Sequence, residues 1–185
     1  MKITKNFSLS TSLKIIKLLK KEFSLKCIPV GSVARGEPKN DDIDLLVYLN
    51  KLNKLNNKKT NNKKTNNKLK LNKIYLNGSR RQGWDIIYKN KHYNIDLFFI
   101  KKKELPYMLF HYIGPRSYNI RTRAYAKKKG WLLNQYGLWK NLLEKNLLEK
   151  SKNKLKRVKG TANIKTEKQL TNFLGLTYRL PNNRK

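Results

Sequence analysis

The stretch GSVARGEPKNDDIDLLVYL, residues 31–49, holds most of the aspartates of a very basic chain. Only five Asp occur in 185 residues, and three of them are Asp41, Asp42 and Asp44. Lys and Arg number 44 against 11 Asp and Glu, which gives a formal net charge of +33. Solubility does not require carboxylates to be crowded into one place, so this stretch is the first candidate for a functional site.

The apolar run after Asp42 predicts a buried strand over residues 43–49. Because alternate residues of a strand face the same side, Asp42 and Asp44 should project together. Two carboxylates so close repel each other unless a cation lies between them, and Mg²⁺ binds carboxylate and phosphate oxygens. Asp96, a lone acid in the apolar run YNIDLFFI, is the candidate third carboxylate of a two-metal site. The alternative for Asp96 is a buried salt bridge to an Arg, because an unpaired buried carboxylate is costly.

Gly31-Ser32 and Arg35-Gly36 bracket an expected tight turn before this strand. Such a turn can direct backbone N–H groups and the Ser32 hydroxyl toward a phosphate, and Arg35 can neutralise a phosphate oxygen. The spacing G-S-x-x-R-G, followed by D-x-D and a distant strand Asp, is much more specific than a glycine pair alone. It indicates a site for a nucleoside triphosphate and its metal ions.

Periodicity predicts short strands and helices along most of the chain. A helix is expected over residues 11–23, with Leu13 on its apolar stripe and Ser10 or Thr11 as its cap. The other expected elements are strands at 27–30, 84–88 and 93–100, helices at 105–112, 118–129 and from Thr166 onward, and a strand-turn-strand at 131–139. Thr166 and Gln169 have the spacing of a capping box.

The sequence predicts an α+β protein of two domains that meet at the run KKKELP, residues 101–106. We expect residues 1–104 to form a mixed sheet flanked by helices, and residues 105–185 to form a small α/β domain. Within the first domain, residues 51–73 contain only Lys, Asn, Leu and Thr and repeat the unit NNKKT. This composition predicts an expanded, mobile loop between two strands. A drifting repeat and a DNA-binding arm explain the loop equally well.

The excess of Lys and Arg predicts a polyanionic partner, either nucleic acid or an anionic membrane surface. The chain has no apolar run near the roughly 18 residues that a membrane span needs, and Lys interrupts its N-terminal segment too often for a signal peptide. An intracellular protein is therefore expected. Cys27 is the single cysteine, which fits a reducing compartment, and we expect it to be a buried apolar residue.

Together these motifs resemble the family X DNA polymerases of the nucleotidyltransferase superfamily. HYIGPRSYNIRTRAYAKKKGWLLNQYGLW, residues 111–139, resembles the family's aromatic pair, glycine turn and Arg-bearing helix, and residues 164–184 resemble its C-terminal segment. The similarity is strongest to short, Lys-rich viral members and covers nearly the whole chain outside 50–80 and 140–160. It implies a nucleotidyltransferase-type palm and a C-terminal domain that contacts nucleotide and DNA, without a lyase or hairpin DNA-grip module.

The resemblance also implies roles for individual residues. Asp42 and Asp44 would hold two Mg²⁺ ions, with Mn²⁺ as an alternative, and Asp96 would help to activate the primer 3′-hydroxyl. The implied nucleotide-binding residues are Gly31, Ser32, Arg35, His111, Tyr112, Gly114 and Arg123. The basic helix of the second domain supplies the expected DNA contacts, Arg121, Lys127, Lys128 and Lys129.

Some positions depart from the family pattern or have simpler explanations. Ala34 stands where larger members carry an additional Arg, and Ile113 stands where the family has Thr before the glycine turn. Asp41 is expected to be a turn residue and Asp85 a structural one. A plain hinge role is the alternative for His111, and core packing is expected of the three tryptophans, Trp84, Trp131 and Trp139.

The leading hypothesis is a monomeric DNA-directed DNA polymerase that fills gaps in repair, such as base excision repair, on gapped or nicked primer-template DNA with dNTPs. A viral member would act in the cytoplasm of an infected cell or in the virion. The alternatives are a template-independent nucleotidyltransferase and a catalytically idle, basic DNA-binding protein.

Overall fold

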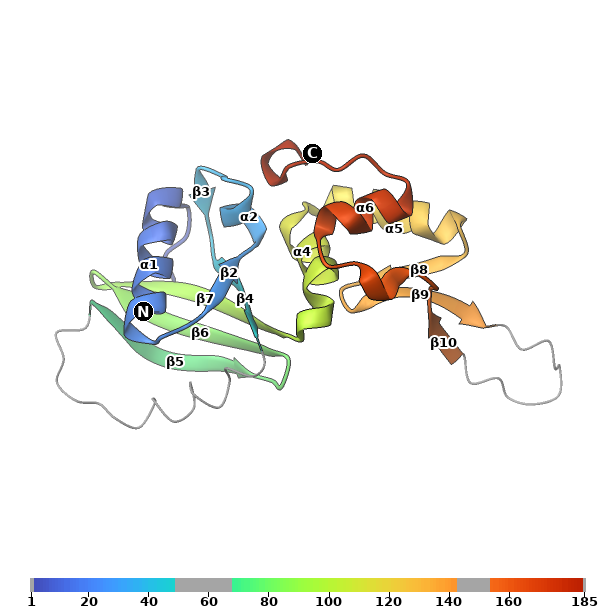
Figure 1. Cartoon of the computed structure of the whole chain (residues 1–185). Coiled ribbons are helices and arrows are strands. Elements are labelled where there is room, and N and C mark those ends of the chain that lie inside the picture. The colour runs from blue at the N-terminus through green and yellow to red at the C-terminus, as the bar shows by residue number, and fades with distance from the viewer. Residues whose placement is uncertain (1, 49–67, 143–153, 185) are drawn as a thin grey trace. The chain divides into compact units, whose positions relative to one another are not determined.

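The structure is a computed structural model that describes residues 2–48, 68–142 and 154–184. The chain divides into two compact units, Met1–Lys102 and Lys103–Lys185 (Figure 1). Most of the low-complexity loop, and nearly all of the duplicated NLLEK segment at residues 141–150, lie outside the described residues.

The first unit is built on a five-stranded mixed sheet with the strand order β2-β4-β7-β6-β5 (Figure 1). These strands are β2 (Cys27–Pro29), β4 (Ile43–Tyr48), β5 (Leu69–Asn77), β6 (Arg81–Tyr88) and β7 (Lys91–Ile100). β4 and β7 run parallel, and the other neighbouring strands pair antiparallel. A second, two-stranded sheet consists of β1 (Phe7–Ser8) and β3 (Lys39–Asn40). The mixed α+β architecture predicted from the sequence is therefore confirmed.

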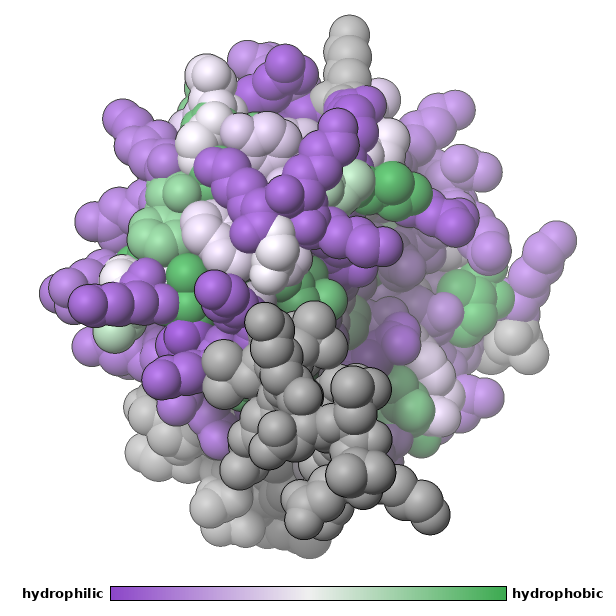
Figure 2. All heavy atoms as spheres, turned by 90° about the vertical axis from the view of Figure 1, so that its right-hand side faces the viewer, coloured by the Kyte–Doolittle hydropathy of each residue, from purple (hydrophilic) through white to green (hydrophobic). Residues whose placement is uncertain are grey.

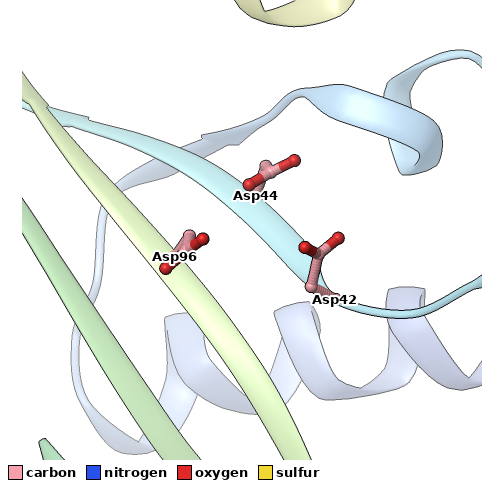
Figure 3. Close-up of side chains that lie close together, drawn as sticks. All are labelled: Asp42, Asp44 and Asp96. Atoms are coloured by element: carbon pink, nitrogen blue, oxygen red, sulfur yellow. The ribbon is translucent and has the colours of Figure 1, made fainter. Parts of the chain in front are cut away.

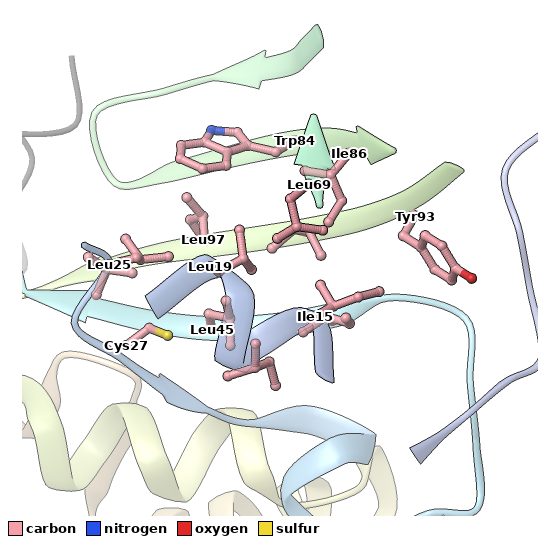
Figure 4. Packing of buried hydrophobic residues seen from close by; sticks show 14 of the residues in the cluster. Ile15, Leu19, Leu25, Cys27, Leu45, Leu69, Trp84, Ile86, Tyr93 and Leu97 are labelled. Carbon is pink, nitrogen blue, oxygen red and sulfur yellow. The ribbon is translucent and has the colours of Figure 1, made fainter. Parts of the chain in front are cut away.

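Helix α1 (Leu9–Glu22) packs on one face of this sheet, and its apolar side chains supply much of the core (Figure 4). Ile15 and Leu19 are fully buried among strand residues such as Leu45 and Trp84. The predicted stripe was wrong at Leu13, which is 51% exposed. The helix begins two residues before the predicted start, and its N-cap is Ser8, whose hydroxyl oxygen accepts the Thr11 N–H.

The predicted strands 84–88 and 93–100 leave four residues between them, but the hairpin between β6 and β7 has only two linking residues. The two linking residues, Lys89 and Asn90, both have positive φ, 49° and 58°. Two left-handed residues in succession match the right-handed twist of the flanking strands. β5 begins at Leu69, so the last part of the predicted loop 51–73 is a strand, and the prediction was wrong for residues 69–73.

The second unit combines helices with a three-stranded antiparallel sheet of order β10-β9-β8. Its helices are α4 (Leu105–Ile113), α5 (Arg116–Lys128) and α6 (Glu167–Leu174), and its strands are β8 (Trp131–Asn134), β9 (Gly137–Leu142) and β10 (Lys154–Arg157). Short 3-10 turns occur at Lys102–Glu104, Thr161–Asn163 and Pro181–Asn183. The capping box at the start of α6 is confirmed, with Thr166 and Gln169 bonded reciprocally.

A second hydrophobic core lies within this unit, around Tyr107, Leu138 and Leu170. An ion pair joins the C-terminal segment to α6. Arg184, which is 3% exposed, pairs with Glu167 at 2.5 Å. Among the described residues, no helix has both the length and the hydrophobicity needed to span a bilayer.

Candidate active site

Three carboxylates meet on neighbouring strands of the first unit (Figure 3). Asp42 immediately precedes β4, Asp44 lies within β4, and Asp96 lies within β7. The parallel register places Asp44 directly beside Asp96. One oxygen of each side chain lies within 4.8 Å of an oxygen of the others. The i, i+2 spacing of Asp42 and Asp44 thus puts them on one side, as the alternation of a strand requires.

The cluster is electrostatically incomplete. Burial, followed by the nearby charges of Asp42 and Asp96, raises the pKa of Asp44 to about 7. Burial and the Asp96 charge also raise the pKa of Asp42. A divalent cation would remove this penalty, since oxygen ligands at this spacing suit Mg²⁺. The residues present therefore fit a divalent metal.

Asp96 differs from the other two carboxylates because it has two hydrogen-bond donors. Arg81 Nη2 lies 2.7 Å from Asp96 Oδ2, and the Tyr75 hydroxyl donates to Oδ1 at 3.1 Å. The salt bridge considered as the alternative for Asp96 is therefore present, and it coexists with the carboxylate cluster. Arg81 and Tyr75 were missed in the sequence. Gly83 was the available signal for Tyr75, because a glycine inside a strand often marks a close approach.

Gly31 packs directly against this cluster. The expected tight turn is instead one helical turn, α2 (Gly31–Ala34). Gly31 has φ +62°, and a Cβ at this position would overlap the Asp44 carboxylate oxygen Oδ2. Both the backbone conformation and the contact require glycine. The glycine at position 31 is thus explained by the space that Asp44 needs.

Ser32 and Arg35, the predicted phosphate ligands, lie on and just after α2 and have partners within the protein. The Ser32 hydroxyl donates to Asn40 Oδ1 at 2.5 Å. Arg35 pairs with Glu37 at 2.6 Å, and its side chain is 17% exposed. The charges of Arg81 and Arg35 offset part of the rise in the pKa of Asp44. Burial and the two neighbouring acids raise this pKa by more. Triphosphate binding by these two residues stays a prediction.

His111, Tyr112 and Arg123 lie together in the second unit. His111 and Tyr112 are on the last turn of α4, with ring centroids 4.7 Å apart in an edge arrangement. Arg123 on α5 donates from Nη2 to His111 Nδ1 at 2.5 Å. Burial and this guanidinium lower the pKa of His111 to about 4, so the ring is neutral at physiological pH.

Gly114 sets the connection between α4 and α5. A Cβ at Gly114 would lie 2.8 Å from Tyr118 Cδ1, closer than packed atoms tolerate. The Asn119 side-chain amide donates to the His111 carbonyl at 2.6 Å and closes the connection. Three of the predicted nucleotide-binding residues of this unit thus lie at the α4–α5 connection and Arg123 reaches them from within α5, while their role stays a prediction.

The four predicted DNA contacts are exposed on α5 or just after it: Arg121, Lys127, Lys128 and Lys129. Lys129 also donates to the Leu174 carbonyl at 2.8 Å and lies over the rings of Tyr125 and Trp131. Lys127 lines a groove of about 600 Å³ beside β8, together with Arg123. Hydrophilic side chains cover most of the face that Figure 2 shows, with small apolar patches between them.

Two other acids have the structural surroundings expected of them. Asp41 is exposed and accepts the Asn6 N–H at 2.8 Å. Asp85 is 2% exposed and lies within hydrogen-bond distance of His92 Nδ1, at 3.0 Å, and of Asn72 Nδ2, at 2.6 Å. Cys27 is buried, as predicted, and burial raises its pKa to about 11, which disfavours a reactive thiolate.

Trp84 is also a core residue, as predicted. It is 1% exposed, and its indole N–H donates to Gln82 Oε1 at 3.1 Å. Trp131 and Trp139 are half-buried.

Comparison with known proteins gives one family throughout. Residues 108–185 match the model of the DNA polymerase beta thumb. The chain is similar to Repair DNA polymerase X of African swine fever virus, with 36% identity over 171 residues to the Badajoz 1971 strain, spanning 92% of this chain and 86% of the relative. The protein of the Tick/Malawi isolate matches equally, at 36% over the same shares.

A solved structure shares the fold. The crystal structure of Leishmania infantum polymerase beta in a ternary P/T complex aligns with a TM-score of 0.70, at 19% identity, over 99% of this chain and 78% of that one. The viral relatives exceed a third identity over nearly the whole chain. On this ground the chain belongs to family X of the DNA polymerases.

Proposed function

We propose that this protein is a DNA-directed DNA polymerase that adds dNTPs to a primer 3′-hydroxyl and fills gaps during DNA repair. The observation that carries the proposal is the group formed by Asp42, Asp44 and Asp96, with oxygens within 4.8 Å of one another. These acids lie in a family X chain of net charge +33. Phosphoryl transfer needs carboxylates at its metal ions and cations around the nucleic acid.

The residues of the cluster would divide the chemistry between them. Asp42 and Asp44 would hold two Mg²⁺ ions, for which Mn²⁺ could substitute, and bound ions supply positive charge to the reacting phosphate. Asp96 would orient and help to deprotonate the primer 3′-hydroxyl. The 3′-oxygen then bonds to the α-phosphorus of the dNTP, and the bond to pyrophosphate breaks.

Residues around the cluster and in the second unit would hold the nucleotide. Ser32, Arg35 and the backbone at Gly31 are proposed to bind the triphosphate, since α2 lies against Asp44. The proposed partners of the base and sugar are His111, Tyr112, Gly114 and Arg123. The low pKa of His111 supports a neutral ring that accepts the Arg123 hydrogen bond.

DNA is the proposed polyanion, and gapped or nicked primer-template is the proposed form. Arg121, Lys127, Lys128 and Lys129 would contact its phosphates from α5. Phosphate contacts release counterions, so DNA affinity should fall steeply with salt. We propose that the protein acts as an intracellular monomer, and in the cytoplasm of an infected cell or in the virion if its source is viral.

Primer extension on a duplex with a one-nucleotide gap tests the proposal. Each dNTP is supplied separately with Mg²⁺, the template base is varied, and EDTA and Asp44→Asn serve as controls. Insertion that follows the template base and stops in both controls supports a template-directed polymerase. Extension that ignores the template would indicate a template-independent nucleotidyltransferase. DNA binding without extension in the presence of any divalent metal would support the alternative of a catalytically idle, basic DNA-binding protein.

A further inference from the structure

Both oxygens of the Asp96 carboxylate are oriented by side chains from one side of β7, one on the adjacent strand β6 and one on the next strand, β5. Oδ2 accepts Arg81 Nη2 from β6 at 2.7 Å, and Oδ1 accepts the Tyr75 hydroxyl from β5 at 3.1 Å. The Arg81 side chain is 50% exposed, so solvent weakens this ion pair. Tyr75 is itself 44% exposed, but its hydroxyl forms a directional hydrogen bond to Asp96 from β5, two strands away.

A break in strand register accompanies the approach of Tyr75. On β5, Ile74 pairs with Trp84 of β6, and Leu76 pairs with the next residue, Gly83. Tyr75 is therefore an extra residue at a register shift. An extra residue of this kind bends the strand and redirects a side chain, and such bulges occur often beside active sites. The strand irregularity in β5 thus falls at Tyr75, the residue whose hydroxyl reaches Asp96.

The intervening strand leaves room for the Tyr75 ring. Gly83 on β6 lies directly opposite Asp96 on β7. A Cβ at Gly83 would overlap the Tyr75 ring at Cε2, Cζ and Cδ2. The Tyr75 ring therefore lies over Gly83 of β6, in the space that a side chain at this position would occupy. Contact of the tyrosine ring with this strand glycine directs its hydroxyl toward Asp96.

We propose that Tyr75 is a positioning residue that holds the Asp96 carboxylate in its working orientation, with Gly83 as the platform for its ring. The inference rests on the proposed function, because Asp96 is the third carboxylate of that reaction. Tyr75 acts through Asp96 and not on the substrate. Three separate features, the hydrogen bond, the register break and the glycine, converge on this one contact.

Tyr75→Phe removes the hydroxyl and keeps the ring, so it is the principal variant. Groups that orient metal-binding residues typically contribute about 10–100-fold to metal affinity or activity. We expect the single-turnover insertion rate to fall by about ten-fold or more, with the dNTP dissociation constant within about two-fold of wild type. The affinity of the free protein for Mn²⁺, measured by electron paramagnetic resonance without DNA, should also fall. Tyr88→Phe, the same change on β6, is the matched control and should match wild type in all three measurements.

Gly83→Ala tests the platform. Its methyl group should displace the Tyr75 ring and cause the same loss, and the double variant Tyr75→Leu/Gly83→Ala should lose no more than Tyr75→Leu alone. Additive losses in the double variant would overturn the role of Gly83. A Tyr75→Phe protein with wild-type insertion rate and wild-type Mn²⁺ affinity would overturn the role of Tyr75.

The Mn²⁺ measurement separates this inference from the proposed function. If the wild-type protein extends no primer, yet Tyr75→Phe and Asp96→Asn both weaken Mn²⁺ binding, the positioning role stands and the polymerase proposal fails. If the wild type fills gaps and Tyr75→Phe equals it in rate and Mn²⁺ affinity, the polymerase proposal stands and the positioning role fails.

Discussion

Asp85 and Asp96 lie on neighbouring strands of one sheet, and their surroundings are opposite. Asp85 is 2% exposed, and the His92 ring and the Asn72 amide both lie within hydrogen-bond distance of its carboxylate. Asp96 is 7% exposed and has Arg81 and Tyr75 as donors, but it shares its space with two other carboxylates. Asp85 has its hydrogen-bonding partners within the protein, whereas Asp96 belongs to a group of three acids whose repulsion Arg81 offsets only in part.

The difference shows that burial alone does not mark a functional acid. A buried carboxylate that has hydrogen-bond donors and is not grouped with other acids, such as Asp85, stabilises the fold. Carboxylates that raise one another's pKa cost stability, and they persist where a cation or substrate compensates them. Asp44, with a pKa raised to about 7, belongs to the second kind. Variants at the two sites should therefore have opposite effects on activity and stability.

The largest expected effect is the loss of activity in Asp44→Asn. Removing one carboxylate removes transition-state stabilisation, so nucleotide insertion should fall on the order of 10³-fold. The melting temperature of the metal-free protein should rise, because the substitution also removes repulsion at the cluster. Gap filling and thermal unfolding of the same preparation measure both effects. Insertion within a few-fold of wild type would contradict the metal assignment, and Asp96→Asn provides a second test.

Asp85→Ala should do the reverse. The buried His92 ring and the Asn72 amide lose their acceptor, which should cost about 1–3 kcal/mol of unfolding free energy. For a chain of this size, each kcal/mol lowers the melting temperature by roughly 2–4 °C. Insertion at saturating DNA and dNTP should stay within about two-fold of wild type at temperatures where the variant is folded. A collapse of insertion without a change in melting temperature would place Asp85 in the active site.

The spacing of nearby residues in the sequence was sufficient to predict the carboxylate cluster and one helix cap. The i, i+2 spacing of Asp42 and Asp44 and the apolar run around Asp96 indicated strands whose acids share a face, and the structure brings them together. The capping box at Thr166 was readable because its two hydrogen bonds join residues three apart. Gly31 was recognised as significant, but its contact with Asp44 depends on how α2 packs on β4 and could not be inferred.

What the sequence did not reveal depends on contacts between distant residues. Leu13 fits the apolar period of α1 as well as Ile15 does, and only the placement of the helix on the sheet decides which is buried. Arg81 and Tyr75 reach Asp96 across strand pairings that no local pattern encodes. The register break at Tyr75 likewise has no sequence signature of its own.

A third test uses pH in the metal-free protein. The pKa of Asp44 is about 7 in the folded state, against roughly 3.9 for an unfolded Asp. Because the folded value is raised, the protonated form favours folding, and this contribution is lost as pH rises from about 4 through 7. The melting temperature of wild type minus that of Asp44→Asn should therefore decrease from pH 5 to pH 8. Adding Mg²⁺ at pH 8 should raise the melting temperature of wild type relative to that of Asp44→Asn. If the difference between the two melting temperatures does not change with pH, the raised pKa of Asp44 is contradicted.

The smallest expected effect concerns Glu37, an acid that is neither buried nor crowded. Its side chain is 45% exposed and pairs with Arg35 at 2.6 Å. Exposed ion pairs contribute about 0.2–1 kcal/mol, so Glu37→Gln should change the unfolding free energy by less than about 1 kcal/mol. If Arg35 binds the triphosphate, the substitution removes a competing carboxylate and should tighten dNTP binding by up to about five-fold. Titration of dNTP in the presence of Ca²⁺ measures this affinity, and Arg35→Ala should weaken it. Weaker binding in Glu37→Gln would instead show that Glu37 holds Arg35 in the orientation that receives phosphate.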